Sequence, residues 1–95
     1  MIKVEIKESR RNNKDTLFNV YFEGKLILKD RRDPEFDACR YFRDLGMTGD
    51  IGFFNVLSGK LRAFIKDLVV GAQRCTIEGN MGIRNGKYVP FKEWT

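Results

Sequence analysis

Residues 2–7 alternate between aliphatic and charged side chains without a break, and no other pattern constrains the fold of this chain as strongly. The aliphatic side chains are those of Ile2, Val4 and Ile6, and the charged ones are those of Lys3, Glu5 and Lys7. Successive side chains of a β-strand point to opposite faces of a sheet. The segment is therefore predicted to be a strand with one buried and one exposed face.

Three short strands are expected in succession at the start of the chain. The polar segment 9–15 contains Asn12-Asn13, two residues that tolerate turn conformations. It separates the first strand from a second one predicted over 16–22, and Glu23-Gly24 then turns the chain into a third segment at 25–29. The side chains that the second strand places on one side are those of Phe18, Val20 and Phe22. This succession is typical of an antiparallel meander.

The clearest helix is predicted over residues 34–45. Asp33 is a good N-cap, Pro34 suits the first helical position, and Glu35 favours the positive end of the helix dipole. The apolar side chains that share one helix face are those of Ala38, Cys39, Tyr41, Phe42 and Leu45. Gly46 stands where a left-handed residue commonly ends a helix.

The segment after residues 51–57, which form a predicted buried strand, permits two structures. Apolar residues recur at helical spacing over 61–72, and this periodicity alone favours one long helix. Ser58-Gly59 between two apolar runs is also typical of a tight hairpin turn. In that case 60–66 would be the return strand, and a shorter helix would follow at 67–73.

The tail of the chain again predicts strands. Residues 75–78 alternate apolar and polar side chains, and 79–82 form a predicted loop. Asn85-Gly86 is a strong hairpin signal before a strand at 87–89. Pro90 would confine any continued pairing to the edge of a sheet.

Three stretches resemble small uncharacterised proteins of bacterial phages and other mobile elements. They are the run DPEFDACR at 33–40, the turn DLGMTG at 44–49, and the Gly71-Ala72 step before a Thr-Ile-Glu strand. The resemblance spans about residues 20–92, and its motifs are caps and turns. In those relatives a short glycine-containing hairpin precedes a brief helix, which implies strand-turn-strand at 51–66 here. The resemblance implies no activity.

We therefore expect one α+β domain over residues 1–95. A mostly antiparallel sheet would carry the helix 34–45 on one face, with a second, shorter helix near 67–73. The predicted core consists of Phe18, Val20, Phe22, Phe42, Leu45, Phe53, Ile65 and Ile77.

Composition argues against catalysis, metal binding and membrane insertion. The chain has no histidine, and its two cysteines, Cys39 and Cys75, are too few for a structural zinc site. No apolar run approaches the length of a membrane span, and the first residues lack the pattern of a signal peptide. We expect a cytoplasmic protein that is not an enzyme and needs no cofactor.

The aromatic pair in residues 51–56 has some likeness to the aromatic strand of RNA-recognition motifs, where rings stack on bases. The basic residue that opens that pattern is absent, because Asp50 precedes the segment. Three predicted strands also come before the first helix, which is the wrong order of elements. A buried strand is the better interpretation.

The net charge of +5 is unevenly distributed along the chain. Residues 1–32 hold nine basic against five acidic residues, 33–58 hold two against five, and 59–95 hold seven against three. The candidate polyanion-binding residues are Arg10, Arg11, Lys14, Arg31 and Arg32. Whether these basic segments meet in space is left open by the sequence, and solvated loop charge is the simpler interpretation.

Two functions follow as hypotheses. The first is a small binding module that associates with protein partners or with itself through an edge strand or through exposed aromatic residues such as Trp94. The alternative is weak, sequence-independent binding of nucleic acid through the basic loops, which salt would weaken steeply.

Overall fold

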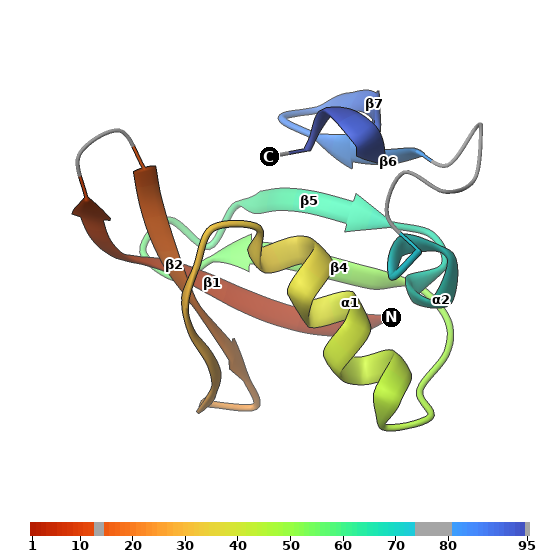
Figure 1. Ribbon diagram of the computed structural model, residues 1–95, viewed down its shortest axis with the longest axis horizontal. Helices are drawn as coiled ribbons and strands as arrows, with labels where there is room; N and C mark the ends of the chain where they lie inside the picture. Colours follow the sequence, from red (N-terminus) through yellow and green to blue (C-terminus); the bar gives the residue numbers. More distant parts are fainter. Residues whose placement is uncertain (13–14, 74–80, 95) are drawn as a thin grey trace.

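The computed structural model describes residues 1–12, 15–73 and 81–94, which form a seven-stranded sheet with helices (Figure 1). The strands are β1 (Ile2–Asn12), β2 (Asp15–Phe22), β3 (Lys25–Arg31), β4 (Ile51–Asn55), β5 (Leu61–Ile65), β6 (Met81–Arg84) and β7 (Lys87–Pro90). The helices are α1 (Pro34–Asp44), α2 (Leu68–Gly71) and the 3-10 helix η1 (Phe91–Glu93). The predicted α+β class is confirmed.

The strands lie in the order β3-β2-β1-β4-β5-β6-β7. The first three form the predicted antiparallel meander, and the pairs β4-β5, β5-β6 and β6-β7 are also antiparallel. β1 and β4 instead pair in parallel, with Ile2 opposite Ile51 and Ile6 opposite Asn55. This pairing arises because α1 carries the chain from the edge strand β3 back to the centre of the sheet.

All described helices lie on one side of the sheet, which we call the inner face. α1 runs across it in front of β1 and β4 (Figure 1) and contacts β2, β3 and α2. α2 packs there as well, since a Cβ on Gly71 would lie 3.0 Å from Ile65 and 3.2 Å from Cys39. η1 joins the same side through Phe91, whose ring meets that of Phe36 edge-on at 5.3 Å. The opposite side of the sheet is the outer face.

The helix prediction is confirmed to within one residue. α1 ends at Asp44, and Gly46 (φ 82°) closes a Schellman motif in which Gly46 N–H donates to Arg43 and Met47 N–H donates to Phe42. Asp33 holds the predicted N-cap position. Its side chain makes no capping hydrogen bond, so the predicted side-chain cap is wrong. Leu45 was expected in the core and is 62% exposed, because the helix has already ended and the chain is turning away.

The hairpin alternative for residues 58–67 is confirmed. β4 and β5 pair in antiparallel fashion around Gly59, whose φ of 69° suits glycine. Asp67 caps α2 by accepting a hydrogen bond from Val69 N–H at 2.9 Å. α2 is shorter than predicted. The helical spacing of 61–72 was misleading because part of it coincides with the two-residue period of a strand.

Two predicted loops are partly strand. β1 continues through Asn12 and pairs with β2, so residues 10–12 of the polar segment are strand. Met81 and Gly82 begin β6, which contradicts a loop over 79–82. The prediction for residues 75–78 lies outside the described residues. The Asn85-Gly86 turn is confirmed, with both residues at positive φ.

The core forms between α1 and the inner face. Of the predicted core residues, Val20, Phe42, Phe53 and Ile65 are fully buried. Phe18 and Phe22 are partly buried and pack against the core, and Ile77 lies outside the described residues. Trp94, which was predicted to be exposed, is only 1% exposed, and its ring contacts Phe36 and Phe91 edge-on. Gly82 is required there, because a Cβ would lie 2.9 Å from the Trp94 ring.

The first turn of α1 also holds a buried carboxylate. Glu35 is 1% exposed, and its Oε1 accepts from Arg62 Nε at 2.7 Å, with Arg84 Nη2 4.0 Å away. The Arg62 guanidinium lies 4.3 Å from the centre of the Phe18 ring, and that of Arg84 lies 5.0 Å from the Trp94 ring. This cluster, which we call the Glu35 clamp, ties the start of α1 to β5 and β6.

A β-bulge in β5 orients the Arg62 side chain toward Glu35. Phe53 pairs with Ala63 and Phe54 pairs with Leu61, so Arg62 is the extra residue. A bulge shifts the alternation of a strand by one position. Arg62 therefore reaches the inner face, although its neighbour Ala63 is buried on that same side.

We expect Phe42→Ala to lower the free energy of unfolding by about 3–5 kcal/mol, because the ring is fully buried and leaves a cavity. Leu45→Ala on the same helix should change it by less than about 0.5 kcal/mol, since Leu45 is exposed. Chemical denaturation measures both. Equal losses would contradict the orientation of α1.

We expect Glu35→Ala to cost about 3–5 kcal/mol, because it leaves the Arg62 guanidinium without its buried partner. Asp37→Ala is the matched control in the same helical turn. Asp37 pairs with Arg31 and Arg40 nearer the surface, so its loss should cost about 1 kcal/mol or less. A Glu35 variant as stable as the Asp37 variant would rule out the clamp as a determinant of stability.

Candidate binding surface on the uncovered face of the sheet

The outer face carries apolar side chains in the middle of the sheet. Gly52 and Phe54 alternate in β4 with the buried Ile51 and Phe53, so they face outward. A Cβ on Gly52 would meet Met1 and the Phe54 ring at 2.9 and 3.2 Å. Both side chains therefore lie on the outer face around Gly52.

An apolar stripe extends from β4 to the edge of the sheet. Phe54 pairs with Leu61, Gly52 with Phe64, and Phe64 in turn with Ile83. Ile83 pairs with Tyr88, which is 71% exposed. We call Phe54, Leu61, Phe64, Ile83 and Tyr88 the outer stripe. None of the helices in the described part of the chain covers it.

A charged row borders the outer stripe. Lys3, Glu5 and Lys7 of β1 project from the same face, with Glu5 beside Phe54 and Lys3 beside Gly52. All three are exposed. Beyond them, Tyr21 pairs with Glu5 and lines a hollow of about 240 Å³. The outer face therefore combines a charged centre with a wide apolar flank.

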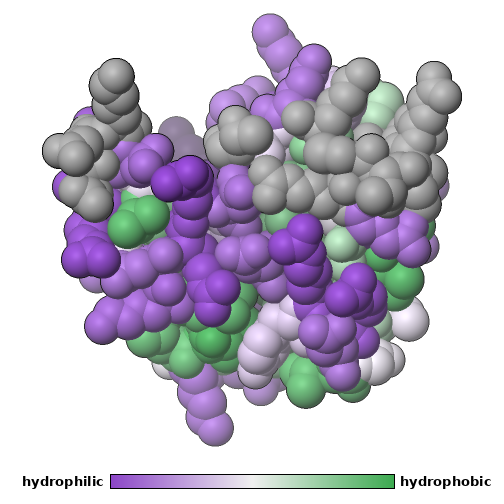
Figure 2. Space-filling view, viewed as in Figure 1, coloured by the Kyte–Doolittle hydropathy of each residue, from purple (hydrophilic) through white to green (hydrophobic). Residues whose placement is uncertain are grey.

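The helix side of the molecule has a different surface. Figure 2 shows it as mostly hydrophilic, apart from a few apolar areas. Exposed ion pairs account for part of this character, such as Arg40 with Asp37 and Arg43 with Asp44.

Both edges of the sheet resist the addition of a further strand. In β3 the pairing register shifts twice, and Asp30 adopts φ 54°. β7 has four residues and ends in Pro90, which has no N–H to donate. Bulges, short strands and proline all disfavour edge-to-edge pairing. The predicted association through an edge strand therefore has little structural support.

The structure brings the predicted basic segments together at one end of the meander. Arg10 and Arg11 lie near the end of β1, Arg31 ends β3 and Arg32 follows it. Lys14 lies outside the described residues. Asp15 at the start of β2 pairs with Arg32 at 2.9 Å, which joins the two segments.

Each of these four arginines faces a carboxylate. The pairs are Arg10 with Asp30 at 3.4 Å, Arg11 with Glu8 at 3.9 Å, Arg31 with Asp37 at 3.7 Å, and Arg32 with Asp15 at 2.9 Å. Asp30 also accepts a hydrogen bond from Ser9 at 2.8 Å. These carboxylates offset part of the positive charge of the four arginines.

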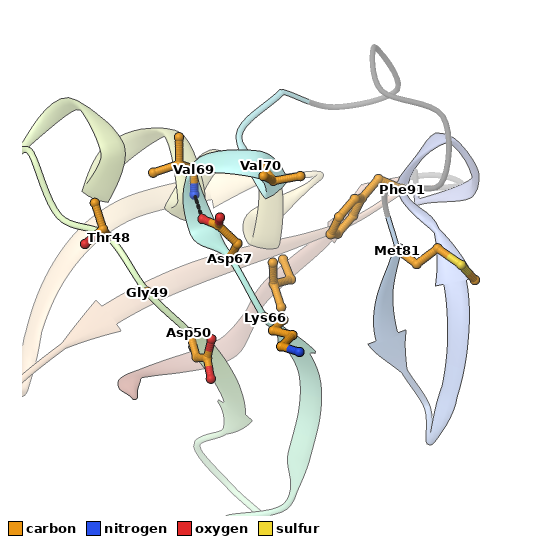
Figure 3. A pocket seen from close by; sticks show the side chains of 10 residues that line it. Thr48, Gly49, Asp50, Lys66, Asp67, Val69, Val70, Met81 and Phe91 are labelled. Atoms are coloured by element: carbon orange, nitrogen blue, oxygen red, sulfur yellow. Dashed lines mark hydrogen bonds between the residues drawn. The ribbon is translucent and has the colours of Figure 1, made fainter.

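A cleft of about 700 Å³ opens between α2, β6 and the loop before β4 (Figure 3). Its polar side chains include Asp50, Lys66 and Asp67. Asp67 is engaged in capping α2, as its hydrogen bond to Val69 shows (Figure 3). Thr48 adds a hydroxyl to the lining, and we assign the cleft no reaction.

Cys39 lies on the buried face of α1, and its burial, together with the charge of Glu35, raises the pKa of the thiol to about 12. A thiol with this pKa stays protonated at neutral pH and is a poor nucleophile. No group of three or more potential metal ligands occurs within residues 1–12, 15–73 and 81–94. Over the same ranges, no helix is long and apolar enough to cross a membrane.

Sequence reasoning missed the outer stripe, although one signal could have revealed it. Two consecutive residues of a strand face opposite sides, so Phe53 and Phe54 cannot both be buried in a sheet with one covered face. Phe64 was hidden because it also fitted the helical spacing. Comparison with known proteins adds no further assignment: no family model, curated protein or solved structure matches the chain.

We expect the arginines of the basic segments to contribute no more to nucleic-acid binding than other surface cations do, because each is already paired with a carboxylate. The variant with Arg10, Arg11, Arg31 and Arg32 all changed to Ala should bind a fluorescent oligonucleotide no more weakly than a variant with Lys25, Lys60, Lys66 and Lys87 changed to Ala. Both lose the same net charge, and binding should be weak, with Kd above ~10⁻⁶ M at physiological salt.

Fluorescence anisotropy at two salt concentrations measures this comparison. A selective loss in the arginine variant, with a smaller dependence on salt, would identify the basic segments as a phosphate-binding site.

Proposed function

We propose that this chain is a small, non-catalytic binding module that associates with a protein partner through the outer face of its sheet. Its origin in a bacterial phage or other mobile element is part of the proposal. That origin is supported by the resemblance of the 33–40 and 44–49 motifs. The outer stripe is the observation that carries the proposal.

An apolar surface of this extent favours a protein partner. Tyr88 is exposed, and Phe54 and Phe64 are partly exposed, so three different strands contribute accessible ring surface. Aromatic residues are enriched at protein interfaces, and burying them removes apolar area from water. Contiguous exposed apolar patches on a small domain commonly mark interaction sites.

The distribution of charge supports the same proposal over nucleic-acid binding. Every arginine in the described residues pairs with a carboxylate, including the four arginines among the five candidates for polyanion binding. An arginine already held by a carboxylate must give up that contact to bind a phosphate. Nucleic-acid binding through the basic segments is therefore the weaker candidate.

The non-catalytic part of the proposal is supported by the state of the reactive groups. The chain has no histidine. Glu35 is held between two arginines, and Cys39 has a raised pKa. Neither Glu35 nor Cys39 is therefore in a state that favours chemistry.

A photo-crosslinking amino acid placed at Tyr88 should yield discrete protein adducts in the cells from which the chain derives. The same amino acid at Arg43, an exposed residue of α1 that pairs with Asp44, should yield none, because Arg43 lies outside the outer stripe. Gel mobility and mass spectrometry of the adducts provide the readout.

Adducts from Arg43 that match those from Tyr88 would show that the contacts are non-specific. The absence of adducts from Tyr88 would contradict a partner on the outer face.

A further inference from the structure

We infer that the occupant of the outer face is a second copy of this chain, packed face to face about a two-fold axis. The inference rests on the proposed function and specifies the partner. It is carried by the register between β1 and β4, which places charges and apolar side chains in a self-complementary pattern.

The charged row supplies the first part of this pattern. Lys3 and Glu5 have opposite charges and face the same way two residues apart in β1. Neither forms an ion pair with another residue in the described ranges. An axis that lies in the interface and crosses β1 midway between them would place Lys3 of each copy over Glu5 of the other. Two intermolecular ion pairs would then form where isolated chains leave the charges in water.

The same axis aligns the apolar residues. Lys3 pairs with Gly52 and Glu5 pairs with Phe54, so the axis also crosses β4 between Gly52 and Phe54. Phe54 of one copy would then lie over the Met1 side chain and the Phe54 ring that surround Gly52 of the other. On β5, Phe64 and Leu61 pair with Gly52 and Phe54, so the axis brings Phe64 over the partner's Leu61. Rings and aliphatic side chains thus meet across the axis.

The size of the face suits a dimer. The molecule measures 32 by 29 Å along its two longer axes. Such a face can supply the roughly 800 Å² that each partner buries in a standard stable interface. Interfaces between identical chains are also more apolar than other interfaces, and the apolar outer stripe suits an interface of that kind.

A nucleic acid fits this face less well. Glu5 lies at its centre, where it would repel a phosphate backbone. Leu61 and Met1 are 49% and 62% exposed, and aliphatic side chains offer bases no stacking surface. A second chain uses both features, because it pairs with Glu5 and buries the aliphatic groups.

Sedimentation equilibrium of the purified chain tests the inference through charge reversal. The wild type should form dimers, whereas Glu5→Lys and Lys3→Glu should each weaken dimerisation at least about tenfold, because like charges would meet across the axis. An equimolar mixture of the two variants should regain dimers, since opposite charges then face each other. Lys7→Glu, with the same change in net charge as Lys3→Glu, should remain dimeric because Lys7 lies outside the predicted pairs.

Circular dichroism and unfolding midpoints equal to those of the wild type would show that the exposed substitutions leave the fold intact. A wild type that stays monomeric at millimolar concentration would overturn the inference. So would a mixture of variants that fails to dimerise, or a Lys7→Glu variant that dissociates like Lys3→Glu. Binding of a single-stranded oligonucleotide that Phe54→Ala abolishes, by a monomeric wild type, would identify nucleic acid as the occupant and also overturn the inference.

The same experiment separates this inference from the proposed function. A monomeric purified chain that still cross-links through Tyr88 to a different protein would overturn the second copy and leave the proposed function standing. A monomeric chain with no such adduct would contradict both.

Discussion

The ion pair between Glu35 and Arg62 determines how the sheet and its main helix are joined. A carboxylate that is 1% exposed is costly to bury unless a cation and hydrogen bonds compensate for the lost water. Arg62 provides both, and the Phe18 ring lies against its guanidinium. Because this contact requires the bulge in β5, the position of α1 depends on a local irregularity of the sheet. Arg84 extends the same constraint to β6 and, through Trp94, to η1.

This constraint divides the molecule into two unlike faces. With α1, α2 and η1 all on the inner face, the apolar residues of the outer face have no cover in the described part of the chain. The arginines are engaged in ion pairs, whereas the lysines of the described residues form none with a described carboxylate. Lys3 therefore remains available beside Glu5 and the outer stripe. Because the described helices all lie on the inner face, that face forms the core and the outer face stays open for binding.

Local signals in the sequence were sufficient to predict most helices and strands. They were not sufficient to predict how the strands pair in the sheet. Pro34 and Gly46 mark the ends of α1, and Glu23-Gly24 and Asn85-Gly86 mark turns, because each depends on backbone preferences of neighbouring residues. The hairpin at Ser58-Gly59 needed the resemblance to other proteins, since periodicity alone favoured a helix. The parallel pairing of β1 with β4 had no local signal. It joins segments about fifty residues apart, and the choice between pairings depends on the whole sheet.

The candidate surface was predictable only in part for the same reason. Alternation in residues 2–7 correctly gave one exposed face to β1, and Lys3, Glu5 and Lys7 lie on it. The basic segments were identified as charged, but their pairing with Asp15 and Asp30 depends on strand register. Trp94 was assigned to the surface because nothing near it in sequence shows that Gly82 leaves room for its ring. Glu35 was attributed to the helix dipole, since Arg62 lies 27 residues away.

The central claim is that contacts form on the outer face, and the eight phenylalanine rings of the chain report on it directly. NMR spectra of protein with ¹³C-labelled phenylalanine rings, recorded across a dilution series, would separate the two faces. The account predicts that the signals of Phe54 and Phe64 move with concentration, while those of the buried Phe36, Phe42, Phe53 and Phe91 stay in place. The account would be contradicted if no ring signal moved with concentration, or if only the signals of the buried rings moved.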